Sequence, residues 1–503
     1  MLDTVEAKAS NTVIRVAGGW VRDKLLGRKS DDIDIALDNL TGEAFAEMVN
    51  SYLLSQGIDA KKVAVVKANP LKSKHLQTAR LKVIGAEVDL VNLRTETYSM
   101  DSRIPEAKFG TAEEDALRRD FTVNALFYNV NTGKVEDLTG RGIDDLRTGV
   151  IQTPLSPKVT FLDDPLRVLR GVRFSARFDF SLHEDLVAAA KDKDIQTALG
   201  SKVSRERIGV ELCGMLSGKM ARPAKALSLL CDLGLMEVIF APPPACSPPR
   251  PETGYNWTAG IAAAHATAAL LCAQDNNAAI IQKKNVLHEE LFFSCALLPL
   301  AVVKYADKKG NMQPVPSFVM KESLKLKVQE GENVTKILQL LPVFQRLADS
   351  PGTREESEVK SRSGLSRLDC GLAVRDAKGL QLWQTCIYLN CAIELSRGSS
   401  DSSNCVELEV GALDQENQVV AKHEGLREAI FNMGLGEAWA IKPLLAGTSI
   451  INDLKVPKGP GVRTVLDEQV LWQLEHPDGT AEECKEHLAN KLASGGIQMP
   501  PAR

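Results

Sequence analysis

A chain of 503 residues is too long for one hydrophobic core, so two to four domains are expected. With 44% hydrophobic and 25% charged residues it has an ordinary globular composition, and no apolar run approaches the roughly eighteen residues of a membrane span. The formal net charge of −4 excludes a general attraction to polyanions, so a nucleic-acid partner must be met by local basic patches.

The cysteines and residues 1–10 give information about the cellular compartment of the protein. There is no Cys-x-x-Cys pair, and the closest two cysteines, Cys386 and Cys391, have no histidine nearby. Reduced thiols of this kind indicate an intracellular protein. Residues 1–10 carry two acids before Lys8 and no apolar stretch, unlike a secretory signal or a transit peptide. We expect cytoplasm, nucleus or both, and a mitochondrial location through an alternative start.

The elements in chain order predict an α+β fold. A mixed sheet with helices is expected first, and a purely helical region follows from about residue 160. Strand-like alternation occurs at 12–19, 31–37, 61–66, 79–93 and 126–138, and helical periodicity at 41–57, 164–178 and 204–218.

Proline-rich and glycine-rich segments and a capping box then divide the helical region. The proline-rich segment 241–254 is the first clear break. Near the end, residues 456–462 form a glycine-proline turn, and Thr480 with Glu483 predicts a capping box. We expect four parts, namely a head (1–159), a neck (160–240), a body (241–435) and a tail (436–503).

Two aspartates stand out at the start of the second predicted strand. Because residues two apart share a face of a strand, Asp32 and Asp34 present their carboxylates together. Their repulsion is relieved by a divalent cation, and hard oxygen ligands suit magnesium. The alternative is an exposed edge strand with two surface acids.

A glycine turn and an arginine precede these aspartates. Gly18 and Gly19 end the first strand and open a helix, where backbone amides favour phosphate. Arg22, one turn into that helix, is suited to fork onto phosphate oxygens. A plain strand-to-helix turn with a surface arginine is the alternative.

The run GGWVRDKLLGRKSDDIDIA (18–36) resembles the signature of the nucleotidyltransferase superfamily that includes DNA polymerase β. More narrowly, it is similar to class II tRNA nucleotidyltransferases, the CCA-adding enzymes. This resemblance implies a polymerase β-like catalytic head in which Asp32 and Asp34 hold two magnesium ions.

The run EEDALRRDFTVNALFYN (113–129) matches the second motif of that family. On the expected helix, Asp120 and Asn124 lie one turn apart and share a face. Asp120 suits a ribose hydroxyl, which favours ribonucleotides, and Arg119 would approach the phosphates. An amphipathic helix with an exposed Arg-Arg-Asp tip is the alternative.

The run FLDDPLRVLRGVRFSARF (161–178) matches the third motif. Arg167, Arg170 and Arg173 recur every three residues and form a basic stripe, which is usually a solvated surface. The resemblance implies that Asp164 and Arg167 hydrogen-bond the incoming base. A carboxylate accepts from an exocyclic amine, and a guanidinium donates to ring nitrogens or a carbonyl. Arg170 and Arg173 would hold the site together or touch phosphate.

Three further segments remain open. Residues 95–110 correspond to a flexible loop of the family that assists the change from CTP to ATP, although a plain surface loop looks the same. Asp89 is either a third acid of the site or a charged edge-strand residue. Residues 456–462 either offer helix amides to an RNA phosphate or simply open a packing helix.

The resemblance implies template-independent addition of C, C and A to the 3′ end of tRNA from CTP and ATP, releasing pyrophosphate. The partners expected are tRNA and the two nucleotides, with the tail binding tRNA, no membrane, and a monomer rather than a stable oligomer. The alternatives are a bacterial-type poly(A) polymerase, a partial enzyme adding only CC or only A, and a catalytically silent RNA-binding protein. The intact aspartate pair and the Asp164–Arg167 pair speak against the silent protein.

Overall fold

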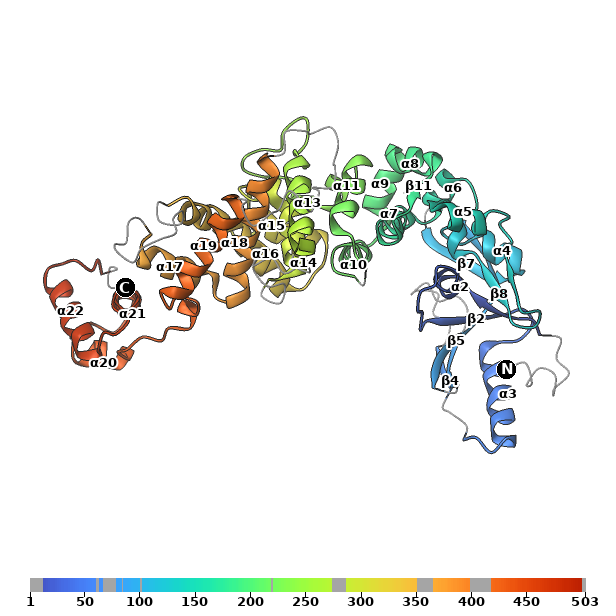
Figure 1. The fold of residues 1–503 in the computed structure, drawn as a ribbon, viewed down its shortest axis with the longest axis horizontal. Helices are drawn as coiled ribbons and strands as arrows, with labels where there is room; N and C mark the ends of the chain where they lie inside the picture. The colour runs from blue at the N-terminus through green and yellow to red at the C-terminus, as the bar shows by residue number, and fades with distance from the viewer. Residues whose placement is uncertain are drawn as a thin grey trace. The chain divides into compact units, whose positions relative to one another are not determined.

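The computed structural model describes residues 12–59, 63–66, 78–83, 85–99, 102–218, 220–273, 286–350, 365–398 and 418–499. The chain forms two compact units, Met1–Ala241 and Pro242–Arg503, and Figure 1 follows it by colour. The boundary falls at the start of the proline-rich segment 241–254. The finer division into head, neck, body and tail stays a prediction.

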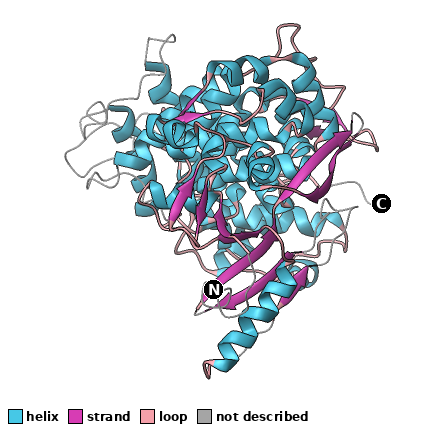
Figure 2. Ribbon diagram, turned by 90° about the vertical axis from the view of Figure 1, so that its right-hand side faces the viewer, coloured by secondary structure: helices cyan, strands magenta, loops and turns pink. Residues whose placement is uncertain are grey.

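A seven-stranded mixed sheet forms the centre of the first unit and confirms the predicted α+β class (Figure 2). Strands β2 and β5 are parallel, and every other neighbouring pair is antiparallel. The predicted strand regions all appear in it. In sheet order the strands are β3 (Ala64–Val66), β4 (Thr78–Val83), β5 (Ala86–Asn92), β2 (Ile33–Leu37), β1 (Ile14–Ala17), β8 (Phe127–Asn129) and β9 (Lys134–Glu136).

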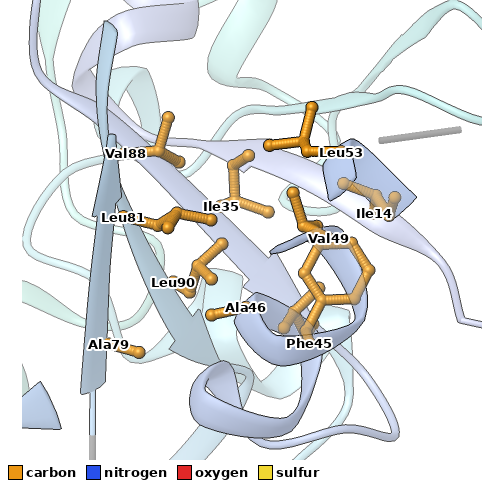
Figure 3. Close-up of a cluster of buried hydrophobic side chains, with 11 residues drawn as sticks. Ile14, Ile35, Phe45, Ala46, Val49, Leu53, Ala79, Leu81, Val88 and Leu90 are labelled. Atoms are coloured by element: carbon orange, nitrogen blue, oxygen red, sulfur yellow. The ribbon is translucent and has the colours of Figure 1, made fainter. Parts of the chain in front are cut away.

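Helix α3 (Gly42–Ser55) covers β4 and β5 and confirms the predicted helix at 41–57. It begins at Thr41, whose hydroxyl accepts the Ala44 N–H at 3.2 Å. Its apolar face, which includes Phe45 and Val49, packs on strand residues such as Leu90 (Figure 3). This burial joins the sheet that carries the aspartates to its covering helix.

The second motif is not the single helix that its pattern predicts. Helix α4 (Ala112–Leu117) ends before the arginine pair, and a 3₁₀ turn η2 (Thr122–Asn124) leads into β8. The Asp120 carboxylate accepts the Phe121 N–H at 2.9 Å, so a side chain takes a backbone donor that helix continuation needs. Asp120 and Asn124 are therefore not one turn apart on a helix.

The described residues of the segment 95–110, namely 95–99 and 102–110, are not a loop. They form most of an antiparallel pair, β6 (Arg94–Ser99) and β7 (Ser102–Phe109), with a register shift between Thr97 and Ser99. The β-branched and aromatic residues in this stretch favour strands, and they outweigh the polar residues, Gly and Pro that suggested a loop.

The expected helices of the third motif and of the run 204–218 are present. They are α7 (Leu166–Phe178) and α10 (Arg205–Leu216), and they follow α6 (Pro157–Asp163). The region is not purely helical, however. Short pairs form between β10 (Val150–Ile151) and β11 (Ser181–Leu182) and between β12 (Lys304–Ala306) and β13 (Met312–Pro314), which satisfy loop backbone groups.

The second unit is built mainly of helices. The longer ones are α13 (Thr258–Ala273), α14 (His288–Leu297), α16 (Val328–Ala348), α17 (Arg367–Ala377), α18 (Leu380–Gly398), α19 (Gln418–Asn432), α21 (Pro460–Glu475) and α22 (Ala481–Ala493). Helix α18 supplies the fully buried Trp383 and Tyr388. The predicted capping box at Thr480 and Glu483 opens α22. Across the ranges that the structure describes, no helix has both the length and the apolar character to cross a bilayer.

The core under α3 predicts a specific loss of stability. Phe45→Ala removes a fully buried ring and should lower the free energy of unfolding by about 3–5 kcal/mol. Leu54→Ala on the same helix, where the side chain is 58% exposed, should change it by less than about 1 kcal/mol. Urea denaturation of both variants measures the difference, and equal losses would contradict the packing described.

Candidate active site

Strand β2 places two of the predicted aspartates at its start. Asp32 is exposed and directly precedes the strand, and Asp34 is half-buried within it. Burial raises the pKa of Asp34, and the neighbouring charges of Asp32 and Asp89 raise it further. The positive charges of Arg119 and Arg80 therefore do not outweigh burial and the neighbouring carboxylates at Asp34.

The third acid, Asp89, has a partner of its own. It lies beside Asp34 in the register of β2 and β5, and Arg80 on β4 donates to its two oxygens at 2.6 and 2.7 Å. In the described ranges, no side-chain hydrogen bond or ion pair engages Asp32 or Asp34, and no group of three or more acids, histidines or cysteines is placed to hold a metal. A cation here is left with two protein carboxylates, which fits magnesium because it keeps waters or substrate phosphates as its other ligands.

The glycine turn leaves room for the side chain of an arginine. Gly18 adopts φ 67°, and a Cβ on it would lie 2.6 Å from Nη1 of Arg119. Gly19 then begins α2 (Gly19–Leu25). Arg119 donates to the Asn124 carbonyl at 3.2 Å, and its charge acts to lower the pKa of Asp34. The guanidinium therefore lies against the glycine turn and close enough to Asp34 to act on its charge.

Arg22 does not reach outward as a phosphate ligand. It is only 5% exposed, its Nε and Nη2 contact Asp23 at 2.9 and 2.8 Å, and Nη1 donates to the Asn124 side chain. Its guanidinium also lies 4.5 Å from the ring centroid of Phe178. Burial lowers its pKa. The sequence-based role differs because rings of α7 cover this arginine, while its donors link α2 to the turn η2.

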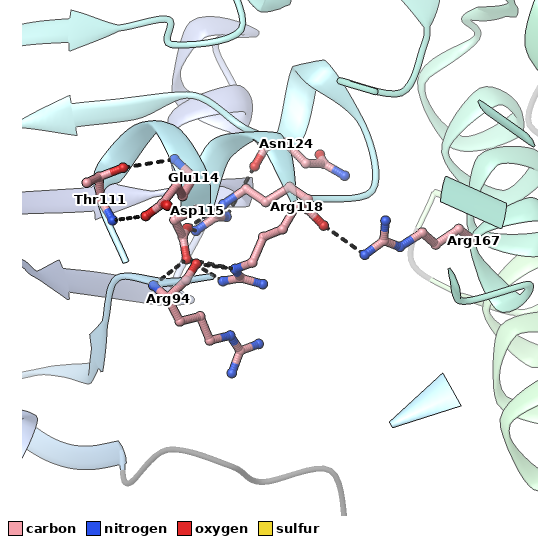
Figure 4. A network of polar contacts seen from close by, with 8 residues as sticks. Arg94, Thr111, Glu114, Asp115, Arg118, Asn124 and Arg167 are labelled. Carbon is pink, nitrogen blue, oxygen red and sulfur yellow. Dashed lines mark hydrogen bonds and ion pairs between the residues drawn. The ribbon is translucent and has the colours of Figure 1, made fainter. Parts of the chain in front are cut away.

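Asp115, which the sequence analysis did not single out, organises the second motif (Figure 4). It is 1% exposed and accepts from Arg118 at 2.9 Å, from Arg119 at 2.8 Å and from the Arg94 N–H at 3.2 Å. Burial acts to raise its pKa, but the two guanidiniums outweigh burial and the pKa is lowered. An acid three and four residues before two arginines was the signal available in the sequence.

Asp120 is saturated with hydrogen bonds. One oxygen accepts from the Asn124 amide at 3.0 Å and from the Phe121 N–H, and the other contacts Arg170 at 2.7 Å. Burial acts to raise the pKa of Asp120, but the Arg170 charge and the Asn124 hydrogen bond prevail and lower it. Asp120 and Asn124 do meet as expected, through a turn rather than a helix.

Helix α7 places the predicted base-reading pair at its start. Asp164 accepts from Arg207 at 3.0 Å and from the Leu166 N–H at 3.3 Å. Arg167 is largely buried and donates to the Arg118 carbonyl at 2.7 Å, which links α7 to the second motif (Figure 4).

Helix α10 anchors the rest of the basic stripe. Arg173 pairs with Glu211 at 2.7 Å, and Arg170 lies 3.6 Å from the same carboxylate. Arg207 and Glu211 were missed, because nothing local in their sequence shows that α10 packs on α7. The stripe is therefore a paired network rather than a solvated surface.

Comparison with known proteins decides the family. A model described as "Poly A polymerase head domain" matches residues 14–152. The chain is 33% identical to "tRNA nucleotidyltransferase cca2" of Schizosaccharomyces pombe, over 97% of this chain and 94% of that protein. It is 33% identical to "CCA tRNA nucleotidyltransferase, mitochondrial" of Saccharomyces cerevisiae, over 96% and 88%. The chain belongs to the CCA tRNA nucleotidyltransferase family.

The fold agrees with this family. A solved structure described as "The structure of CCA-adding enzyme apo form II" superposes with a TM-score of 0.61 at 19% identity, covering 98% of this chain and 93% of that one. As a nucleotidyltransferase, the protein is an enzyme of a generally metal-dependent kind.

The Asp115 network predicts an acid-sensitive stability. Its folded pKa lies below the unfolded value of about 3.9, so it stabilises the fold above about pH 4 and loses this effect as the pH falls through the folded value. Asp115→Asn leaves two arginines without their carboxylate and should cost about 3 kcal/mol at pH 7.

Denaturation at several pH values measures both effects. Glu113→Gln, an exposed position on the same helix, is the matched control and should change little. An Asp115→Asn variant as stable as this control at pH 7 would contradict the role given to the network.

Proposed function

We propose that the protein adds C, C and A in order to the 3′ end of tRNA from CTP and ATP and releases pyrophosphate. The observation that carries this is the presence of two side-chain pairs in one unit of a CCA tRNA nucleotidyltransferase. One is the aspartate pair at the start of β2, which has no hydrogen-bond or ion-pair partner in the described ranges, and the other is the aspartate–arginine pair where α6 ends and α7 begins. The first suits phosphoryl chemistry, and the second suits reading a base without a nucleic-acid template.

Asp32 and Asp34 would hold magnesium, and two ions are proposed. When bound, magnesium lowers the pKa of an attacking hydroxyl and neutralises charge on phosphate oxygens. Arg119 adds positive charge beside Asp34, where the triphosphate must lie for attack on its α-phosphate. Gly18 keeps this approach open because any side chain there meets the guanidinium.

Asp164 and Arg167 would read cytosine and adenine by accepting from the exocyclic amine and donating to ring nitrogens or the carbonyl. Arg207 and the Arg118 carbonyl fix their orientation. A ribose contact for Asp120 is less direct than the resemblance implies. Its carboxylate has about four acceptor positions, and Phe121, Asn124 and Arg170 use them. We therefore propose Asp120 as a positioning residue for Arg170.

The tail is proposed to bind tRNA through the start of α21. Lys455, Lys458 and Arg463 lie around this end, and Pro460 removes one backbone donor from it. The other end of α21 borders a hollow of about 620 Å³ whose lining includes Glu475, Asp478, Glu483 and Glu486. Its charge disfavours phosphate, so only the basic end suits RNA.

We propose an intracellular monomer, in cytoplasm, nucleus or both, with a mitochondrial form through an alternative start. Two alternative activities remain in the same reaction class. The family model that matches residues 14–152 is described as a poly(A) polymerase head domain, so the first alternative is a poly(A) polymerase that adds long A tails. A partial enzyme adding only CC or only A is the other, and a silent RNA-binding protein is disfavoured by the aspartate pair.

Transcripts of tRNA that end before CCA, after C and after CC, incubated with magnesium and labelled CTP or ATP, test the proposal. Three nucleotides added in order to the first transcript, followed by a stop, are expected. Long A tails would support a poly(A) polymerase, addition of only CC or only A would support a partial enzyme, and binding without incorporation would support the silent protein.

The aspartate pair predicts a chemical rather than a structural defect. Asp32→Ala and Asp34→Ala should each reduce incorporation on the order of a thousandfold or more, since several kcal/mol of charge stabilisation are lost. Thermal unfolding should stay near that of the parent protein. Asp38→Asn, an exposed residue just past the other end of β2, is the control and should remain active. Full activity in either alanine variant would remove that residue from the site.

A further inference from the structure

Three guanidinium groups gather around one buried phenyl ring. The guanidinium carbons of Arg22, Arg28 and Arg177 lie 4.5, 4.8 and 5.2 Å from the ring centroid of Phe178. The ring of Phe174 stacks almost parallel on Phe178, with centroids 5.9 Å apart. Attraction to the ring faces offsets part of the repulsion between the three charges. The cluster concentrates positive charge within the first unit.

Only one of these arginines has a carboxylate partner among the described residues. Arg22 is paired with Asp23. Among the described residues, the side-chain hydrogen bond of Arg28 is to the sulfur of Met220, 3.8 Å from its Nη1, and a thioether is a weak acceptor. The Nε of Arg177 is buried and has no acceptor.

The acid that is closest in sequence to Arg177 is already engaged. Asp179 accepts from Arg222 at 2.7 Å and from Lys225. It therefore does not compensate Arg177. Two guanidiniums are thus left with positive charge that the described part of the protein does not balance, and one of them has an unused donor.

The cluster is tied to both halves of the active site. Arg28 stands four residues before Asp32, and its N–H donates to the Asp23 carbonyl at 2.8 Å, which fixes it to the end of α2. Phe178 ends the helix that carries Arg167, about 16 Å farther along the axis. An anion held here would lie at the opposite end of α7 from Arg167, beside the segment that leads from α2 to Asp32.

We infer that Arg28 and Arg177 bind a backbone phosphate of the RNA strand whose 3′ end is extended at Asp32 and Asp34. This inference rests on the proposed function and specifies where its RNA substrate is held. Guanidiniums fork onto phosphate oxygens, and stacking on Phe178 holds their planes without using their donors. A nucleoside triphosphate also offers phosphate oxygens to an arginine. Its proposed position, however, is beside Asp34, where Arg119 and the Gly18 turn lie.

Direct binding measurements on the full chain test the site. Arg28→Gln and Arg177→Gln are compared with Arg147→Gln, an exposed arginine paired with Asp144 on the surface of α5 (Gly142–Thr148). The dissociation constant for a tRNA transcript lacking CCA is measured over a series of salt concentrations, and that for ATP is measured separately. Each cluster variant should bind RNA about tenfold more weakly and reduce the salt slope by about one, with ATP binding and the control unchanged.

The outcomes separate the possible sources of phosphate. Loss of ATP affinity with RNA affinity intact would assign the cluster to the triphosphate and overturn the inference. No change in either would show that the cluster only packs, and would overturn it too. Arg28→Lys and Arg177→Lys keep the positive charge, so their salt slope should equal that of the parent protein. These lysine variants are measured in place of a glutamine variant that fails to fold. The dissociation constants are measured without nucleotide addition. If the parent protein failed to add CCA, this result would therefore contradict the proposed function and leave the phosphate-binding inference to be decided by the binding data.

Discussion

The burial of Arg22 is the interaction on which the rest of the site depends. Its guanidinium connects Asp23 and Asn124 on one side with the rings of Phe174 and Phe178 on the other. A buried charge is tolerated only when its donors are satisfied, so the position of α7 against α2 is narrowly defined. Without this contact, the sheet that carries Asp34 and the helix that carries Arg167 would be held together by fewer interactions.

From Arg22 a continuous polar network leads through the site. Asn124 contacts Asp120, which holds Arg170, and Arg170 approaches Glu211 of α10. Each carboxylate in this series is paired, and the lowered pKa of Asp120 reflects that pairing despite its burial. The exception is the start of β2, where Asp34 has a raised pKa and no partner in the described ranges. Within this network, the carboxylate left without a partner is thus the one at the start of β2.

The sequence predicted those parts of the structure that depend on local spacing. The strands, α7, α10 and the aspartate pair follow from periods of two and of 3.6 residues, which need no knowledge of distant contacts. The pattern failed where a side chain competes with the backbone, as at Asp120, or where strand-forming residues are mixed with polar ones, as in β6 and β7. The burial of Arg22 was not predictable, since it depends on Phe178, more than 150 residues later.

The same distinction explains why the roles of the arginines were harder to predict than those of the aspartates. An arginine in a motif is equally suited to bind phosphate or to pair with a protein carboxylate, and only its surroundings decide. Asp23, Asp120 and Glu211 pair with Arg22, Arg170 and Arg173, so these three arginines mainly position other groups. Arg119 pairs with Asp115 but also acts on the charge of Asp34. Arg28 and Arg177 have no carboxylate partner in the described part of the chain, and the phosphate-binding role proposed for these two residues rests on this difference in pairing rather than on the number of arginines.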